Sequence, residues 1–316
     1  MKRLLTYGLL LLTILASHFV VSACQDDLPE ATDIMVTFTT RATPGADDSD
    51  SPTLEQMHDL RVIMLRSDGT IVDMGYYKPE EENLNPSSVK FTFSTTIPNP
   101  EGEDFTFIAI ANEESIYEES IDEELPWSTR GIGDKLTQSE IESITVDTDI
   151  NSKPIPQTDY WTVHVPQSNY KIDDRTLQFA GSKISVVFNN MTKEPQSLSN
   201  IRITGITPNT QGYLFKQDGT DNIDSKDNNA TPISWNEVLT LAAPTTGDEG
   251  ETIYASDSVA YYTYPLAASN FDSPKLYATW GDDTRELDLS GITSLKRNEH
   301  LRIEITLTPA GDITVN

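Results

Sequence analysis

Apolar residues alternate with polar ones over many short segments of the chain, which is the pattern of strands with one buried face. The alternating apolar positions are Ile34, Val36 and Phe38; Val89, Phe91 and Phe93; Phe105, Phe107 and Ala109; Trp161, Val163 and Val165; Ile184, Val186 and Phe188; Leu276, Ala278 and Trp280; and Leu301, Ile303 and Ile305. Turn sequences such as Ser67-Asp68-Gly69 and Gly281-Asp282-Asp283 separate these segments. Many short strands joined by polar turns predict an all-β protein built from β-sandwiches.

One segment departs from this alternation and predicts a short helix in the first half of the chain. Thr137 and Glu140 have the spacing of a capping box, and Ile141 and Ile144 follow at helical spacing. We expect this helix to pack over one end of a sheet. Polar and acidic runs predict loops at 42–52, 113–124 and 218–229.

The division into domains follows from the chain length and from one polar stretch. The 316 residues exceed one typical domain and suit two domains of about 140 residues once an N-terminal leader is removed. The stretch Pro166–Asp174 is polar and lies between the strand around Trp161 and the strand around Leu177. We therefore expect two β-sandwich domains, at 24–170 and 171–316.

The first 23 residues have the features of a secretory signal peptide. Lys2 and Arg3 precede an apolar run over residues 4–21, and the run leads into Val21-Ser22-Ala23-Cys24. This ending resembles the lipobox of bacterial lipoproteins, in which the cysteine thiol accepts the lipid. A transmembrane helix is the alternative, but the run is barely long enough to cross a bilayer and contains polar residues. We therefore expect cleavage of residues 1–23 and a lipid anchor on Cys24.

The composition narrows the class of partner and excludes disulfides. The sequence carries 50 acidic and 22 basic residues, a net charge of −28, and loss of the first 23 residues would remove two of the basic ones. Such a chain repels nucleic acid and anionic lipid surfaces, so neither is an expected partner. Cys24 is the single cysteine of the sequence, which leaves none for a disulfide, a metal site or a catalytic nucleophile.

The sequence holds few of the patterns that carry catalysis or cofactor binding. The histidines beyond the leader, His58, His164 and His300, are far apart and lack metal-ligand spacing. The sequence contains no nucleophile elbow, phosphate loop or dinucleotide-binding motif. The acidic run 218–227 lacks the closing glutamate of an EF-hand loop, so we expect a solvated hairpin tip rather than a calcium site. We therefore expect no enzyme activity, no metal and no cofactor.

Several short motifs follow one another in a consistent order along the chain. They are the lipobox ending at Cys24, Thr40-Arg41-Ala42, Leu60–Leu65 with the turn Asp68-Gly69, Phe105–Asn112, Ala180–Ile184 and Arg297–Ile305. Together they resemble the fimbrillins, the subunits of type V pili in anaerobic Gram-negative bacteria. Asp26 and Asp27 also resemble a surface-export signal of lipoproteins from such bacteria. The resemblance covers nearly the whole chain and implies two transthyretin-like β-sandwich domains in tandem, with the short helix in the first.

The resemblance also implies a mode of assembly. In the family, an arginine-specific protease removes the first strand of a lipidated precursor, and a C-terminal strand of a neighbouring subunit fills the groove. Carried over to this sequence, the cut falls between Arg41 and Ala42. The donor strand would contain Leu301, Ile303, Ile305 and Leu307, or Ile313 and Val315. The implied partners are other pilus subunits, the outer membrane through the lipid, and a ligand on a host or bacterial surface.

Three interpretations stay open from the sequence. The leading one is a structural subunit of a fimbria, of the stalk or tip type, with a lipid-retaining subunit at the pilus base as its variant. The second is a surface lipoprotein that binds glycan through tryptophans displayed on one platform. Trp161 and Trp280 lie on apolar strand faces and are expected in the core, whereas Trp127 and Trp235 are undecided. The third is a secreted hydrolase.

Overall fold

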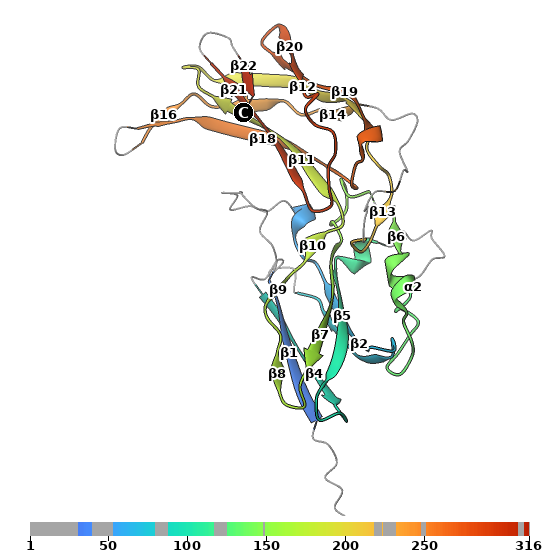
Figure 1. Ribbon diagram of the computed structural model, residues 1–316. Helices are drawn as coiled ribbons and strands as arrows, with labels where there is room; N and C mark the ends of the chain where they lie inside the picture. The colour runs from blue at the N-terminus through green and yellow to red at the C-terminus, as the bar shows by residue number, and fades with distance from the viewer. Residues whose placement is uncertain are drawn as a thin grey trace, which may run out of the picture.

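The computed structural model describes residues 31–39, 53–79, 88–116, 125–147, 149–217, 223, 232–247, 251–308 and 313–315. These residues are mostly in strands, which form four main sheets arranged as two pairs, one above the other in Figure 1. The predicted all-β class is confirmed. In this part of the chain, no helix is long and apolar enough to cross a membrane. Cys24, Arg41 and Ala42 lie outside the described residues.

The first pair of sheets contains the N-terminal strands. The β1 sheet consists of β4 (Ser88–Thr96), β1 (Ala31–Thr39), β8 (Tyr170–Lys171) and β9 (Arg175–Thr176), with β1 in the middle. The β5 sheet has the order β10 (Gln178–Phe179), β7 (Gln157–Val165), β5 (Glu103–Ala111), β2 (Leu60–Arg66) and β3 (Ile71–Tyr77). Between the sheets lies an apolar core that includes Ile34, Val36, Phe38, Leu60, Met64, Phe93, Phe105 and Phe107. The inward positions of these strands follow the alternation of the sequence.

The second pair of sheets contains the C-terminal strands. The β11 sheet has the order β18 (Ala255–Thr263), β11 (Ser182–Asn190), β21 (His300–Leu307) and β22 (Ile313–Val315). The β12 sheet has the order β14 (Ile233–Trp235), β12 (Gln196–Ile206), β19 (Phe271–Trp280) and β20 (Asp283–Asp288), and β15 (Leu239–Leu241) also pairs with β12. Short pairs are formed by β6 (Thr145–Val146) with β13 (Gly212–Tyr213) and by β16 (Thr245–Thr246) with β17 (Thr252–Ile253). A second core lies between these sheets. Within the β11 sheet, β21 pairs with β11 in the parallel direction.

The predicted helix is confirmed as α2 (Gln138–Glu142). Its capping box is complete, because the Thr137 side chain accepts the N–H of Glu140 while the Glu140 carboxylate accepts the N–H of Thr137. Arg130 donates to the same carboxylate at 2.6 Å. These bonds lower the pKa of Glu140 to about 2, the Arg130 bond most. Ile141 is buried in a third apolar cluster on the outer face of the β5 sheet.

The change from the first pair of sheets to the second falls later than the expected boundary. β8 and β9 pair with β1, and β10 pairs with β7, so residues 170–179 contact the first pair. The polar stretch Pro166–Asp174 therefore lies along the first sandwich rather than between two domains. β11, which begins at Ser182, is the first strand of the second pair. We accordingly propose that the domains divide between Phe179 and Ser182.

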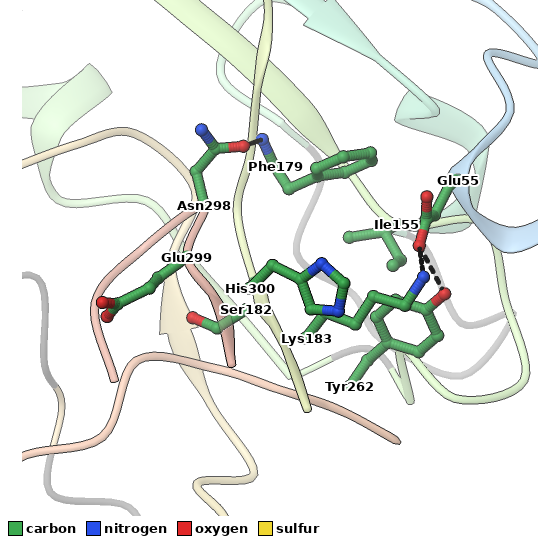
Figure 2. A pocket seen from close by; sticks show the side chains of 10 residues that line it. Glu55, Ile155, Phe179, Ser182, Lys183, Tyr262, Asn298, Glu299 and His300 are labelled. Atoms are coloured by element: carbon green, nitrogen blue, oxygen red, sulfur yellow. Dashed lines mark hydrogen bonds and ion pairs between the residues drawn. The ribbon is translucent and has the colours of Figure 1, made fainter. Parts of the chain in front are cut away.

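Side chains from both sandwiches meet in a charged junction, shown in Figure 2. Glu55 comes from η1 (Thr53–Glu55), and its carboxylate accepts hydrogen bonds from Lys183 Nζ and from the Tyr262 hydroxyl, each at 2.7 Å. The Lys183 and Glu55 side chains are only 13% and 4% exposed. On the same junction, Arg297, which precedes β21, donates to Thr158 Oγ1 of β7 at 2.7 Å and to the backbone carbonyls of Tyr213 and Leu214. These contacts hold the two sandwiches against each other.

Candidate strand-exchange site

β1 is an integral inner strand of the first sandwich. It forms nine antiparallel pairs with β4, from Ala31 opposite Thr96 to Thr39 opposite Ser88. Its inward side chains are almost inaccessible to solvent; Ile34 and Val36 are 0% exposed and Phe38 is 1% exposed. Removing β1 would therefore open a groove along the whole length of β4, with an apolar floor.

Phe38, near the C-terminal end of β1, packs among aromatic rings. The Phe38 ring meets the Phe91 ring at 6.1 Å and the Trp161 ring at 5.8 Å, both in edge-to-face geometry. Trp161 in turn stacks on Phe107 at 5.2 Å. The floor of the groove beneath Phe38 thus consists of rings from both sheets. A strand that replaces β1 would gain most by placing a large apolar side chain at this position.

The energetic cost of an empty groove can be estimated from these side chains. Burying one large apolar side chain contributes roughly 1.5–3 kcal/mol, so Ile34, Val36 and Phe38 together account for about 5–9 kcal/mol. The unpaired backbone groups of β4 would add to this cost, because exposed strand edges recruit new partners. A first sandwich without β1 therefore favours capture of another strand.

The two predicted donor strands differ in how they are held. β21 lies between β11 and β22 and makes eight parallel pairs with β11. Its Ile303, Ile305 and Leu307 are at most 3% exposed and belong to the second core, whereas Leu301 is half-buried. β22, which contains Ile313 and Val315, is an edge strand with three pairs to β21. Release of β22 would leave the second core covered by β21. Release of β21 would instead remove Ile303, Ile305 and Leu307 from that core and expose it to solvent.

The arginines of the described residues are held by other groups of the protein. Arg61, Arg66, Arg130, Arg175, Arg285 and Arg302 form ion pairs with carboxylates, Arg297 donates to backbone carbonyls, and Arg202 stacks over Tyr277. All of them lie within strands, beside strands or in tight turns of the two sandwiches. Arg41, the predicted cleavage residue, lies between β1 and η1 and outside the described residues.

The histidines and tryptophans are spread over the fold. His164 is exposed on β7, where its ring contacts Asp104 at 2.7 Å, and His300 contacts Ser185 at 2.7 Å on the β11 sheet. Across the described ranges, no group of three or more metal-binding side chains gathers. The tryptophans pack on apolar clusters; Trp127 is 2% exposed, and Trp161, Trp235 and Trp280 are partly buried. They do not form the shared platform that the glycan-binding interpretation needs.

A buried polar cluster beside β5 was not predicted from the sequence. Asn112 has a left-handed backbone with φ of 61°, and its side chain donates to the carbonyls of Gln56 and Ile155 at 2.9 and 2.8 Å. Asp59 accepts the N–H of Glu113 at 2.8 Å, and burial raises the pKa of Asp59. The Ala-Asn ending of the strand was the one signal, since asparagine is enriched in left-handed conformations. The cluster fastens the start of β2 to the end of β5.

Comparison with known proteins shows which solved structures share this fold. The chain matches no protein-family model and no curated protein sequence. A crystal structure of a candidate cell adhesion protein from Parabacteroides distasonis superposes with a TM-score of 0.51 at 12% identity, covering 90% of this chain and 96% of that one. The tip fimbrial protein Mfa3 from Porphyromonas gingivalis, solved with a C-terminal truncation, gives a TM-score of 0.50 at 14% identity, covering 91% and 98%. The chain therefore has the fold of fimbrial and cell adhesion proteins, as the resemblance to the fimbrillins implied.

Proposed function

We propose that the protein is a structural subunit of a cell-surface fimbria, exported as a lipoprotein and assembled by strand exchange. The observation that carries the proposal is the placement of β1. This first strand of the described chain has a continuous inward apolar face and nine pairs to a single neighbour. A cut after Arg41 would free it without interrupting any other strand. The groove that remains would accept an extended segment of another subunit by strand addition.

The position of β22 at the sheet edge supports it as the donor. Its three pairs with β21 are few, and its release leaves Ile303, Ile305 and Leu307 in the second core. Ile313 and Val315 alternate in the same way as Val36 and Phe38, so both can face the floor of the groove. β21 would offer a longer apolar row, but eight pairs with β11 hold it in its own sandwich.

The cleavage step is tested with purified protein carrying Cys24→Ala, so that the lipid does not interfere. Treatment with an arginine-specific protease should release the segment that ends at Arg41, detected by mass spectrometry, and should be followed by filaments in electron micrographs. Arg41→Ala should remain a folded monomer. Arg285→Ala is the matched control, because its side chain is 44% exposed and lies on β20 of the other sandwich. If Arg41→Ala assembles as well as the control, cleavage after Arg41 is not the trigger.

The donor step is tested separately by ending the chain after Thr308. This truncated protein should be cut normally and should fail to form filaments by itself, since it has a groove and no β22 to give. Added in excess to the parent, it should shorten filaments, because its groove accepts the donor strand at one filament end and it offers no donor strand to the next subunit. Normal filament growth of the truncated protein alone would rule out β22 as the donor and favour β21.

A further inference from the structure

The segment that joins β7 to β10 runs along the second edge of β1. We call residues 166–177 the strap; it contains β8 and β9, and Figure 1 shows it beside β1 at the side of the sandwich away from β5. The strap makes four parallel pairs with β1, in two groups separated by Ile172, Asp173 and Asp174. β4 makes nine pairs with the other edge of β1. The strap is therefore the weaker of the two walls that hold β1.

Each end of the strap is fastened by a side chain. At one end, Asn169 Oδ1 accepts the N–H of Asp33 at 3.1 Å. At the other end, Arg175 donates from Nε and Nη2 to Asp159 Oδ2 at 2.8 and 2.7 Å. Asp159 belongs to β7 of the opposite sheet, so this ion pair closes the side of the sandwich. The pair is partly shielded, since its side chains are 34% and 15% exposed.

Arg175 also covers the Trp161 ring, which packs against Phe38 of β1. Its guanidinium lies 4.6 Å from the centre of the Trp161 ring, and this ring contacts Phe38. The backbone of Arg175 pairs with Phe38, and its carbonyl accepts the Thr39 hydroxyl at 3.2 Å. One residue thus contacts β1, the aromatic floor and the opposite sheet. Movement of Arg175 would loosen all three contacts together.

We infer that the strap is the gate of the groove and that Arg175 is its latch. β1 leaves sideways past the strap, and the partner strand enters by the same route. Opening this side breaks only the four pairs between the strap and β1. The edge of β4 meanwhile stays available for pairing with either strand. The inference rests on the proposed strand exchange and specifies the side of the sandwich through which the strands exchange. It also defines the partner strand: to pair with β4 antiparallel and with the strap parallel, that strand must run in the direction of β1.

The latch is tested by hydrogen–deuterium exchange on the uncut protein. Arg175→Ala should raise the exchange rate of strap and β1 amides about tenfold, which corresponds to ~1.4 kcal/mol, while β11 and β21 amides keep the parent rate. Arg175→Lys keeps the charge without the planar stacking and should give a smaller increase. Arg285→Ala removes an exposed ion pair from the other sandwich and should leave all these rates unchanged.

Release is then measured on protein cut between β1 and η1, at Arg41 or at a protease site placed within residues 43–52. Arg175→Ala should free the β1 fragment about tenfold faster than the parent. Equal strap exchange in the variant and the parent would overturn the latch, and faster strap exchange with unchanged release would overturn the gate. If Arg175→Ala releases the β1 fragment faster but neither the variant nor the parent forms filaments, the gate is supported and the proposed assembly is contradicted.

Discussion

Replacing Phe38 by alanine should destabilise the first sandwich more than any exposed change on the same strand. Phe38 is 1% exposed and its ring contacts Phe91 and Trp161 edge to face. Truncating a core phenylalanine to alanine costs about 3–5 kcal/mol, and the two ring contacts place this site in the upper part of that range, at about 4–5 kcal/mol. For a sandwich of this size the melting temperature should fall by about 8–20 °C.

The measurement is urea unfolding followed by tryptophan fluorescence, because Trp161 lies directly against Phe38. Met35→Ala is the matched control: it lies on the same strand, is 36% exposed on the opposite face, and should change the free energy of unfolding by less than about 1 kcal/mol. The two variants should therefore separate clearly. If Phe38→Ala loses no more stability than Met35→Ala, β1 is not an integral strand, and the groove it would leave does not exist.

Three further outcomes are expected. Lys183→Met should lower the free energy of unfolding in urea by about 3–5 kcal/mol, because it leaves the buried Glu55 carboxylate without its cation. A decrease below about 1 kcal/mol would show that the junction is solvated. The pKa of Glu140 is held at about 2, below its ordinary 4.5, so its contribution to the free energy of unfolding is present above pH 4.5 and is lost as the pH falls toward 2. Glu140→Gln should lack this loss of stability in acid. The loss stays under about 1 kcal/mol, because the Glu140 side chain is 39% exposed. Cys24→Ala should abolish labelling by a palmitate analogue in cells, and equal labelling of variant and parent would exclude the lipid anchor.

The local features of the fold were predictable because they repeat over short distances. The alternation at Ile34, Val36 and Phe38 correctly predicted which side chains of β1 face the core. The spacing of Thr137 and Glu140 predicted the helix, since a capping box involves residues only three positions apart. In each case the physical cause lies within one strand or one helical turn.

Features that depend on distant pairing were not predictable. β8 and β9 have two residues each, too few to show a period, so the strap resembled a polar linker. The junction joins Glu55 to Lys183, which are 128 residues apart, and neither residue stands out in its local sequence. Alternation also does not tell whether a strand pairs parallel or antiparallel, so β21 gave no sign of its place beside β11.

The parallel pairing of β11 and β21 has a mechanical consequence for a filament. β11 begins at Ser182, where the first sandwich joins the second, and β21 ends at Leu307, from which β22 would reach the next subunit. Tension along the filament would pull these two ends apart in opposite directions. Because the strands are parallel, that pull acts along the ladder and loads its eight pairs together in shear, rather than peeling them one at a time. In pulling experiments, tension applied between residues 182 and 307 should rupture the sandwich at a higher force than tension applied between residues 182 and 300.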